Sequence, residues 1–240
     1  MPNNYFQFKQ FTVQQENCAM KVCTDACLFG AYVADTILKE NLPIKNCLDI
    51  GTGTGLLSLM LAQKIAAQIN AVEIDTAAHS EAKENFKQSP WKEKFTIFNT
   101  DILQFNTNKK YDCIISNPPF FEGDLKSSYS NKNAAKHDTA LTLLQLLQVV
   151  IKHLQDDGFF AVLIPHHRVN YCIDEAAKLN LYLNKKILVK QTAKHDYFRG
   201  MLFFEKQQGA YSSEEIIIKN VNGDYTDAFT FLLKEYYLYL

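Results

Sequence analysis

The stretch CLDIGTGTGLL, residues 47–57, passes from an apolar run through a glycine-rich segment and back to apolar residues. The first run contains Asp49, and Gly51, Gly53 and Gly55 follow at every second position. Glycine adopts backbone conformations that other residues avoid, and it lets the chain pass close to a bound molecule. The stretch therefore predicts a strand, a tight turn and a helix, with the turn facing a ligand. A loop that turns for packing reasons alone is the plainer alternative.

Strand and helix patterns alternate along most of the chain. Near-continuous apolar strands separated by helices form a parallel sheet that is covered on both faces. The last two apolar runs have no long helix between them, so the final strand should be antiparallel. A last, aromatic-rich helix is expected from about Thr226. We therefore predict an α/β fold with a doubly wound, mostly parallel sheet of seven strands, at residues 47–50, 69–74, 95–99, 111–116, 158–165, 183–191 and 201–207.

Composition limits the class of protein. The 240 residues are 47% hydrophobic, which is enough for one sizeable core, so we expect a single domain over residues 1–240. Because 25 Lys and Arg face 26 Asp and Glu, no overall positive field indicates a nucleic-acid partner, and any such contact must be local. The sequence has no signal-peptide pattern and no run of about 18 apolar residues, which predicts a cytoplasmic protein with no membrane partner. We expect a monomer.

The cysteines raise the question of a metal site. Cys18, Cys23 and Cys27 lie close together, but their spacing is not the paired CxxC of a zinc site and no second pair follows. Without a secretion signal, all six cysteines are expected to be reduced thiols. We therefore expect no bound metal.

Acidic residues follow the second and third predicted strands. Glu73 lies 22 positions after Gly51, where a carboxylate at the end of a second strand accepts hydrogen bonds from ribose hydroxyls. Asp75 competes for that role, and the plainer alternative is that one of the two caps the next helix. Asp101 follows the third strand, where a helix or turn cap explains an aspartate equally well.

The stretch NPPF, residues 117–120, ends the fourth predicted strand. Pro118 and Pro119 cannot donate to a sheet, so the strand must stop and the chain must leave in an extended form. Asn117 is thereby held at the carboxyl end of a parallel strand, where such sheets bind ligands. Its side-chain oxygen and the Pro118 carbonyl offer two acceptors to an exocyclic amine, and Phe120 offers a flat face to a flipped base. A strand exit with buried phenylalanines is the plainer alternative.

These motifs resemble those of known methyltransferases. The GxGxG loop after an acidic strand end is similar to that of class I S-adenosylmethionine-dependent methyltransferases, whereas the dinucleotide pattern GxGxxG is absent after Gly53. Asn-Pro-Pro-Phe resembles the motif of amino methyltransferases that act on adenine N6, guanine N2 or glutamine. The likeness extends to the bacterial tRNA adenine N6-methyltransferases that modify position 37 of valine tRNA. It is carried by four further stretches: AMKVCTDACLFGAY, SPW, the His137-Asp138 pair and the aromatic tail. These matches span nearly the whole chain, and in that family residues 1–40 would form a cap over the cofactor site.

The resemblance implies a Rossmann-like sheet, S-adenosylmethionine as the cofactor and tRNA as the partner. It places the methionine end of the cofactor against Lys21, Thr24 and Asp25, although a plain helix N-terminus also explains the last two. It favours Glu73 over Asp75 for the ribose, and it assigns the adenine amino group to Asp101. The implied cofactor-binding set is Lys21, Thr24, Asp49, Gly51, Gly53, Gly55, Glu73, Asp101 and Asn117.

Contacts with RNA are expected on local basic segments, at residues 126–138, 166–168 and 185–199. A run of charges is more often a solvated face, and that alternative stays open. The family usually has a tyrosine where Phe120 stands, and it often has an arginine where Lys136 stands, a change that removes a bidentate phosphate contact. The candidate RNA-binding set is Lys126, Lys132, Lys136, His137, His167 and Arg168.

The implied chemistry is direct in-line transfer of a sulfonium methyl group to adenine N6. The expected catalytic residues are Asn117, Pro118, Pro119 and Phe120, with no metal, no covalent nucleophile and no dedicated base, since the proton can leave after transfer. A guanine N2 methyltransferase acting on ribosomal RNA differs only in the base received. A glutamine methyltransferase acting on a protein usually has a helical N-terminal extension, for which there is no room before Gly51. A non-catalytic RNA-binding module and a nicotinamide dehydrogenase are the remaining alternatives.

Overall fold

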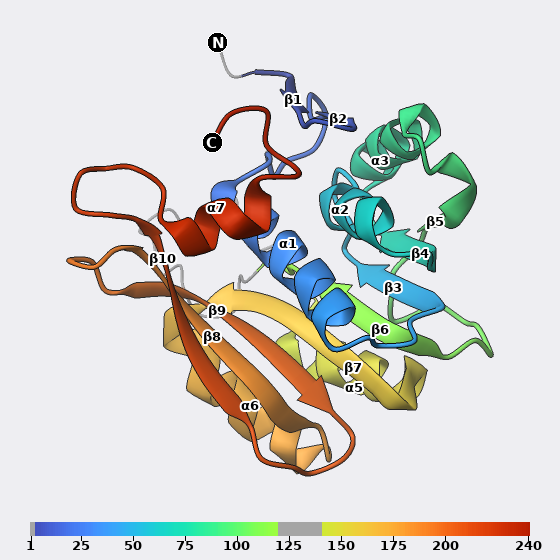
Figure 1. Ribbon diagram of the computed structural model, residues 1–240. Helices are drawn as coiled ribbons and strands as arrows, with labels where there is room; N and C mark the ends of the chain where they lie inside the picture. The colour runs from blue at the N-terminus through green and yellow to red at the C-terminus, as the bar shows by residue number, and fades with distance from the viewer. Residues whose placement is uncertain (1–2, 120–140) are drawn as a thin grey trace, which may run out of the picture.

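The computed structural model describes residues 3–119 and 141–240. Within them, eight strands form one sheet in the order β10-β8-β9-β7-β6-β3-β4-β5 (Figure 1). All neighbouring strands are parallel except β9, which runs antiparallel to β7 and β8. The strands are β3 (Asn46–Ile50), β4 (Gln68–Glu73), β5 (Phe95–Asn99), β6 (Tyr111–Ser116), β7 (Leu154–Pro165), β8 (Tyr182–Thr192), β9 (Tyr197–Glu205) and β10 (Ser212–Lys219).

The predicted α/β class with a mostly parallel sheet is confirmed, but the sheet contains one strand more than the sequence pattern indicated. The additional strand is β10, which lies parallel to β8 at the edge of the sheet. The first four residues of β10 are polar and exposed, and only its second half is apolar, so it lacks a long apolar run. The antiparallel strand is therefore β9, which is not the last strand of the chain.

Helices cover both faces of the sheet (Figure 1). Successive strand residues point to opposite faces, so Cys47 of β3 belongs to one apolar cluster and Leu48 to the other. The first cluster includes residues of α1 (Thr24–Lys39), α2 (Leu56–Lys64), α3 (Thr76–Gln88) and α7 (Asp227–Leu233). The second includes residues of α5 (Leu143–His153) and α6 (Val169–Lys178). Among the described residues, no helix is both long and apolar enough to span a bilayer.

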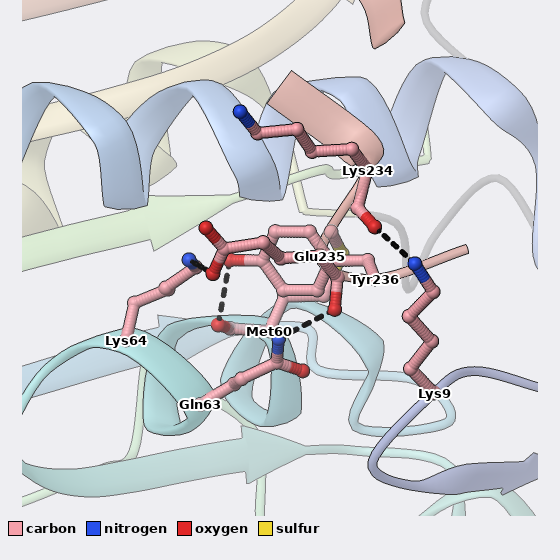
Figure 2. Close-up of polar contacts among 7 residues, drawn as sticks. All are labelled: Lys9, Met60, Gln63, Lys64, Lys234, Glu235 and Tyr236. Atoms are coloured by element: carbon pink, nitrogen blue, oxygen red, sulfur yellow. Dashed lines mark hydrogen bonds and ion pairs between the residues drawn. The ribbon is translucent and has the colours of Figure 1, made fainter. Parts of the chain in front are cut away.

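The two ends of the chain meet on α2 (Figure 2). The hairpin of β1 (Tyr5–Gln7) and β2 (Thr12–Gln14) precedes α1. Beyond α7 the chain turns back, and the buried Tyr236 donates its hydroxyl to the Met60 carbonyl at 3.1 Å. Lys9 donates its Nζ to the Lys234 carbonyl at 2.6 Å and its backbone N–H to the Tyr236 carbonyl at 2.8 Å.

The expectation of one long C-terminal helix is therefore correct only for its start. Thr226 caps α7 by accepting a hydrogen bond from the Phe229 N–H at 3.3 Å, as a cap at this position should. The helix ends at Leu233, because the residues that follow turn to bury Tyr236 and to pair Glu235 with Lys64 (Figure 2).

The parallel strands bring the candidate residues to one edge of the sheet. β3 leads into the glycine loop, β4 ends at Glu73, β5 ends two residues before Asp101, and β6 ends immediately before Asn117. The Ser116 hydroxyl donates to the Ile50 carbonyl at 2.8 Å, which joins the end of β6 to the start of the glycine loop. This is the edge at which open α/β sheets bind ligands.

Candidate cofactor and acceptor site

The glycine loop needs its glycines for two different reasons. Gly51, Gly53 and Gly55 have φ angles of +69°, +56° and +84°, a region that side chains disfavour. A Cβ on Gly55 would lie 2.5 Å from Cε1 of the Phe86 ring, so this glycine permits close packing of the loop on α3. A Cβ on Gly51 would have nothing within 4 Å, so this glycine leaves space on the open side of the loop. The loop is thus packed at one end and open to a ligand at the other.

Asp49 presents an unsatisfied acceptor beneath the loop. Its side chain is fully buried, and Oδ2 accepts hydrogen bonds from the Thr52 hydroxyl at 2.6 Å and the Ser58 hydroxyl at 2.7 Å. No group in the described part of the chain donates to Oδ1. Burial raises the pKa of Asp49 to about 6, partly offset by the two hydroxyl hydrogen bonds. A buried carboxylate with one free oxygen fits a ligand that brings a cationic N–H donor.

Glu73 and Asp75 have different hydrogen-bonding roles in the structure. Glu73 is buried, with Oε2 accepting from the Gly53 N–H at 2.8 Å and Oε1 accepting from the Asp75 N–H at 2.9 Å. Asp75 caps α3, because its Oδ1 accepts from the Ala78 N–H at 2.8 Å. The Glu73 carboxylate therefore lies against the glycine loop, whereas Asp75 is the N-cap of α3, and the ribose-binding role of Glu73 stays a prediction.

Two exposed apolar side chains beside these acids were missed by the sequence analysis. Ile74 directly follows Glu73 and is 57% exposed, and Leu103 follows Asp101 and is 44% exposed. Asp101 itself accepts from the Leu103 N–H at 2.9 Å, which is the turn-forming role given above as its plainer alternative. For Ile74, an apolar residue immediately after a strand end was the available signal, since exposed apolar surface at a ligand-binding edge is suited to a flat ring; Leu103 lies further from the end of β5 and has no such signal.

Asn117 is half-buried at the end of β6, with Pro118 buried and Pro119 exposed behind it. Its Nδ2 lies 3.9 Å from the Met20 sulfur, so the segment before α1 reaches the predicted acceptor residue. The other predicted residues of this region lie outside the described part of the chain; they are Phe120, Lys126, Lys132, Lys136 and His137.

The predicted methionine-end residues are tied to other parts of the protein. The Lys21 ammonium donates to the Gln15 carbonyl, so it holds the preceding segment in place. Thr24 is the first residue of α1. Asp25 accepts from Arg199 Nε at 2.7 Å, which connects the start of α1 to β9.

The remaining basic candidates divide into two groups. His167 and Arg168 lie in the short helix η2 (His166–Arg168), directly after β7 and on the same edge as Asn117. Lys185 and Lys190 lie within β8 and pair with Glu40 at 2.6 Å and Glu215 at 3.0 Å. The pairing reduces the positive charge that β8 can offer to a phosphate.

The cysteine cluster shows no metal geometry. Within residues 3–119 and 141–240, no three metal-binding side chains come together. All six cysteines are free thiols. Burial raises the pKa of both Cys23 and Cys27 to about 12, so these thiols stay protonated and are poor nucleophiles near neutral pH.

Comparison with known proteins agrees with this geometry. Residues 19–180 match the methyltransferase small domain family. Two curated proteins are named tRNA1(Val) (adenine(37)-N6)-methyltransferase. The protein from Dyadobacter fermentans is 40% identical, over 99% of this chain and 99% of its own length. The protein from Cytophaga hutchinsonii is 39% identical, over 100% of both chains. An Escherichia fergusonii protein of the same name is 35% identical, over 99% of this chain and 96% of its own length.

Solved structures show the same fold. A predicted O-methyltransferase from Agrobacterium tumefaciens superposes with a TM-score of 0.67 at 12% identity, over 88% of this chain and 96% of its own. A glycopeptide N-methyltransferase complexed with S-adenosylmethionine superposes with a TM-score of 0.55 at 9% identity, over 74% of this chain and 94% of its own. The fold and the site thus define a class I methyltransferase that uses S-adenosylmethionine.

The similar proteins identify the family within this class. The chain belongs to the methyltransferase small domain family, and within it to the family of the bacterial tRNA1(Val) (adenine(37)-N6)-methyltransferases. The predicted family and cofactor are confirmed. The residues present also fit the cofactor, because the free oxygen of Asp49, the open space at Gly51 and the buried Glu73 carboxylate meet at one loop.

We predict that Gly51→Ala weakens S-adenosylmethionine binding at least about tenfold, because the new methyl group occupies the space left open for the ligand. Gly223→Ala is the matched control, since Gly223 has a φ of +90° and equally open surroundings in a turn before α7. Both variants should lose roughly 1–2 kcal/mol of stability from the same backbone strain. Titration calorimetry measures the affinities, and equal affinities in the two variants would contradict the assignment of the loop.

The Asp49 carboxylate should make cofactor binding depend on pH. Its pKa is raised to about 6, and the ammonium group of S-adenosylmethionine favours the ionised carboxylate. We therefore expect the affinity to fall as the pH drops through about 6 and to level off near neutral pH, below the pKa of the ligand's own amino group. Asp49→Asn should bind more weakly at neutral pH and show little change between about pH 5 and 7. A wild-type affinity that does not vary over this range would refute the role of Asp49.

Proposed function

We propose that this protein transfers a methyl group from S-adenosylmethionine to the exocyclic N6 of adenine at position 37 of valine tRNA. The observation that carries the proposal is the position of Asn117, at the end of β6 and joined through the Ser116–Ile50 hydrogen bond to the strand that enters the glycine loop. The names of the full-length relatives support the choice of base and of tRNA. The protein would act in the cytoplasm as a monomer, without a metal.

The acceptor side is assigned to Asn117 and the prolines after it. Bound S-adenosylmethionine supplies a methyl group on a positively charged sulfur. The Asn117 side-chain oxygen and the Pro118 carbonyl accept from the two N–H groups of the adenine amine, which fixes the direction of its lone pair. Both acceptors also stabilise the positive charge that develops on the amine, and the proton can leave to water afterwards. Phe120 would stack on the flipped base, in the role given to it by sequence alone.

The cofactor side is assigned to the loop and the acids around it. Asp49 accepts from the amino group of the methionine portion, and Glu73 accepts from the ribose hydroxyls while it holds the Gly53 N–H. The exposed side chains of Ile74 and Leu103 offer apolar contact to the adenine ring. Asp101, Lys21 and Thr24 keep the cofactor-binding roles that the family resemblance implies.

The RNA side is assigned to the edge that continues from Asn117. η2 follows β7, the strand next to β6, and this supports the proposal that His167 and Arg168 contact phosphates on either side of a flipped base. Arg199 lies opposite Pro165 in the pairing of β7 with β9, but its ion pair with Asp25 reduces the charge that it can offer to a phosphate. Lys126, Lys132, Lys136 and His137 follow the acceptor motif in sequence and remain RNA-binding candidates.

Asn117→Ala should reduce methylation by two orders of magnitude or more, because the amine loses an oriented acceptor, while S-adenosylmethionine affinity stays nearly unchanged. The measurement is nucleoside mass spectrometry of total tRNA incubated with isotopically labelled cofactor, with N6-methyladenosine as the expected product. Asn108→Ala, in the exposed connection before β6, is the matched control. Loss of cofactor affinity together with activity would contradict this division of roles, and label in ribosomal RNA guanine or in protein would replace the substrate.

Arg168→Ala should weaken tRNA binding and lower the slope of log affinity against log salt by about one, since one phosphate contact is lost. Lys178→Ala provides the control, because Lys178 is an exposed cation at the opposite end of α6 that pairs with Glu175 at 2.6 Å. Binding is measured by filter retention at several salt concentrations. A salt slope identical to that of the wild type would remove Arg168 from the RNA-binding surface.

A further inference from the structure

The segment at residues 14–20, called here the strap, begins with the last residue of β2 and leads toward α1. At its middle, a Cβ placed on Gly53 would lie 3.6 Å from the Cys18 sulfur, so the strap lies against the glycine loop. At its end, the Met20 sulfur lies 3.9 Å from Asn117 Nδ2. The strap therefore runs from the cofactor loop to the acceptor asparagine, although it contains almost no regular secondary structure of its own.

Glu81 on α3 holds the middle of the strap. Its side chain is buried, with Oε1 accepting from the Asn17 N–H and Oε2 accepting from the Cys18 N–H, both at 2.9 Å. Two consecutive backbone N–H groups thus bind the two oxygens of one carboxylate. Burying a carboxylate costs free energy unless it is fully hydrogen-bonded, so these two hydrogen bonds fix the position of the strap relative to α3.

Asn85, one helical turn later on the same face of α3, holds the start of the strap. Its Oδ1 accepts from the Gln14 N–H at 2.8 Å, and its Nδ2 donates to the Gln14 carbonyl and to the Thr54 carbonyl, both at 2.9 Å. Thr54 lies between Gly53 and Gly55. A single buried amide group therefore joins the strap to the glycine loop, and both of its donor hydrogens are used.

We propose that Glu81 and Asn85 are positioning residues for the methyltransferase reaction, which hold the strap across the cofactor and thereby set the affinity for S-adenosylmethionine. The proposal rests on the assignment of the glycine loop to the cofactor and does not depend on the identity of the RNA. Apolar side chains at both positions would pack α3 onto the protein equally well. The polar groups of Glu81 and Asn85, unlike apolar side chains, bind the strap backbone by hydrogen bonds, and Asn85 also binds the loop.

The test compares Glu81→Gln with Glu84→Gln on the same helix. Glu84 is exposed and, within the described part of the chain, its side chain binds only its helical neighbours Lys87 and Gln88, so its variant controls for the loss of a charge on α3. A glutamine at position 81 can accept from one strap amide, and its own NH₂ opposes the other. We expect the Kd and KM for S-adenosylmethionine to rise by about tenfold in Glu81→Gln, as for loss of one charge-assisted hydrogen bond.

A second readout separates positioning from simple support of the fold. In Glu81→Gln, the amides of Asn17 and Cys18 should exchange hydrogen faster, kcat at saturating cofactor should stay within about twofold of the wild type, and KM for tRNA should not change. Asn85→Ala should give the same pattern, and it serves if Glu81→Gln folds poorly.

Two results would overturn the proposal. Faster exchange of the strap amides with unchanged cofactor affinity would mean that the strap contributes nothing to binding. A lower kcat with an unchanged KM for the cofactor would mean that the two residues only keep the protein folded. Failure of the proposed tRNA reaction would appear instead in the wild-type product analysis and would leave the comparison of cofactor affinities intact.

Discussion

The hydrogen bond from the Gly53 N–H to the Glu73 carboxylate is the contact on which the rest of the site depends. It joins the loop after β3 to the end of β4 and fixes the acid against the loop backbone. The carbonyl of the next residue, Thr54, accepts a hydrogen bond from Asn85, and Gly55 packs on the Phe86 ring. Both contacts position α3 against the loop. One short turn of backbone therefore orients two strands, a helix and the strap.

Three buried acids surround this turn in a chain whose net charge is only −1. Glu73 and Glu81 each accept two backbone N–H groups, which compensates for their removal from water. Asp49 differs, because both of its donors reach one oxygen and the other oxygen has none in the described part of the chain. These acids are thus hydrogen-bonded except at Asp49 Oδ1, and a ligand with a sulfonium and an ammonium group would complement their negative charge.

The sequence predicted those features that depend on local pattern. Three alternating glycines, an acid after the second strand and Asn-Pro-Pro after the fourth each specify their own backbone geometry, so they could be placed without a structure. Glu81 and Asn85 could not be predicted, because in the sequence they belong to the polar face of an amphipathic helix. Both bind a segment more than sixty residues earlier in the chain, which the sequence pattern does not reveal. The polar first half of β10 and the turn after Leu233 could not be predicted for the same reason, because both are formed by contacts with residues distant in the sequence.

The meeting of the two termini has a consequence for how the protein is made. Lys9 donates hydrogen bonds to the carbonyls of Lys234 and Tyr236, and Phe8 forms an antiparallel β-bridge with Tyr237. During synthesis these partners leave the ribosome after all the described strands, so the sheet has had time to form before they appear. A nascent chain that stops before Tyr236 keeps the first hairpin without its C-terminal support and leaves the surface of α2 uncovered. Unfinished chains therefore differ from finished ones in a feature that proteases and chaperones can recognise.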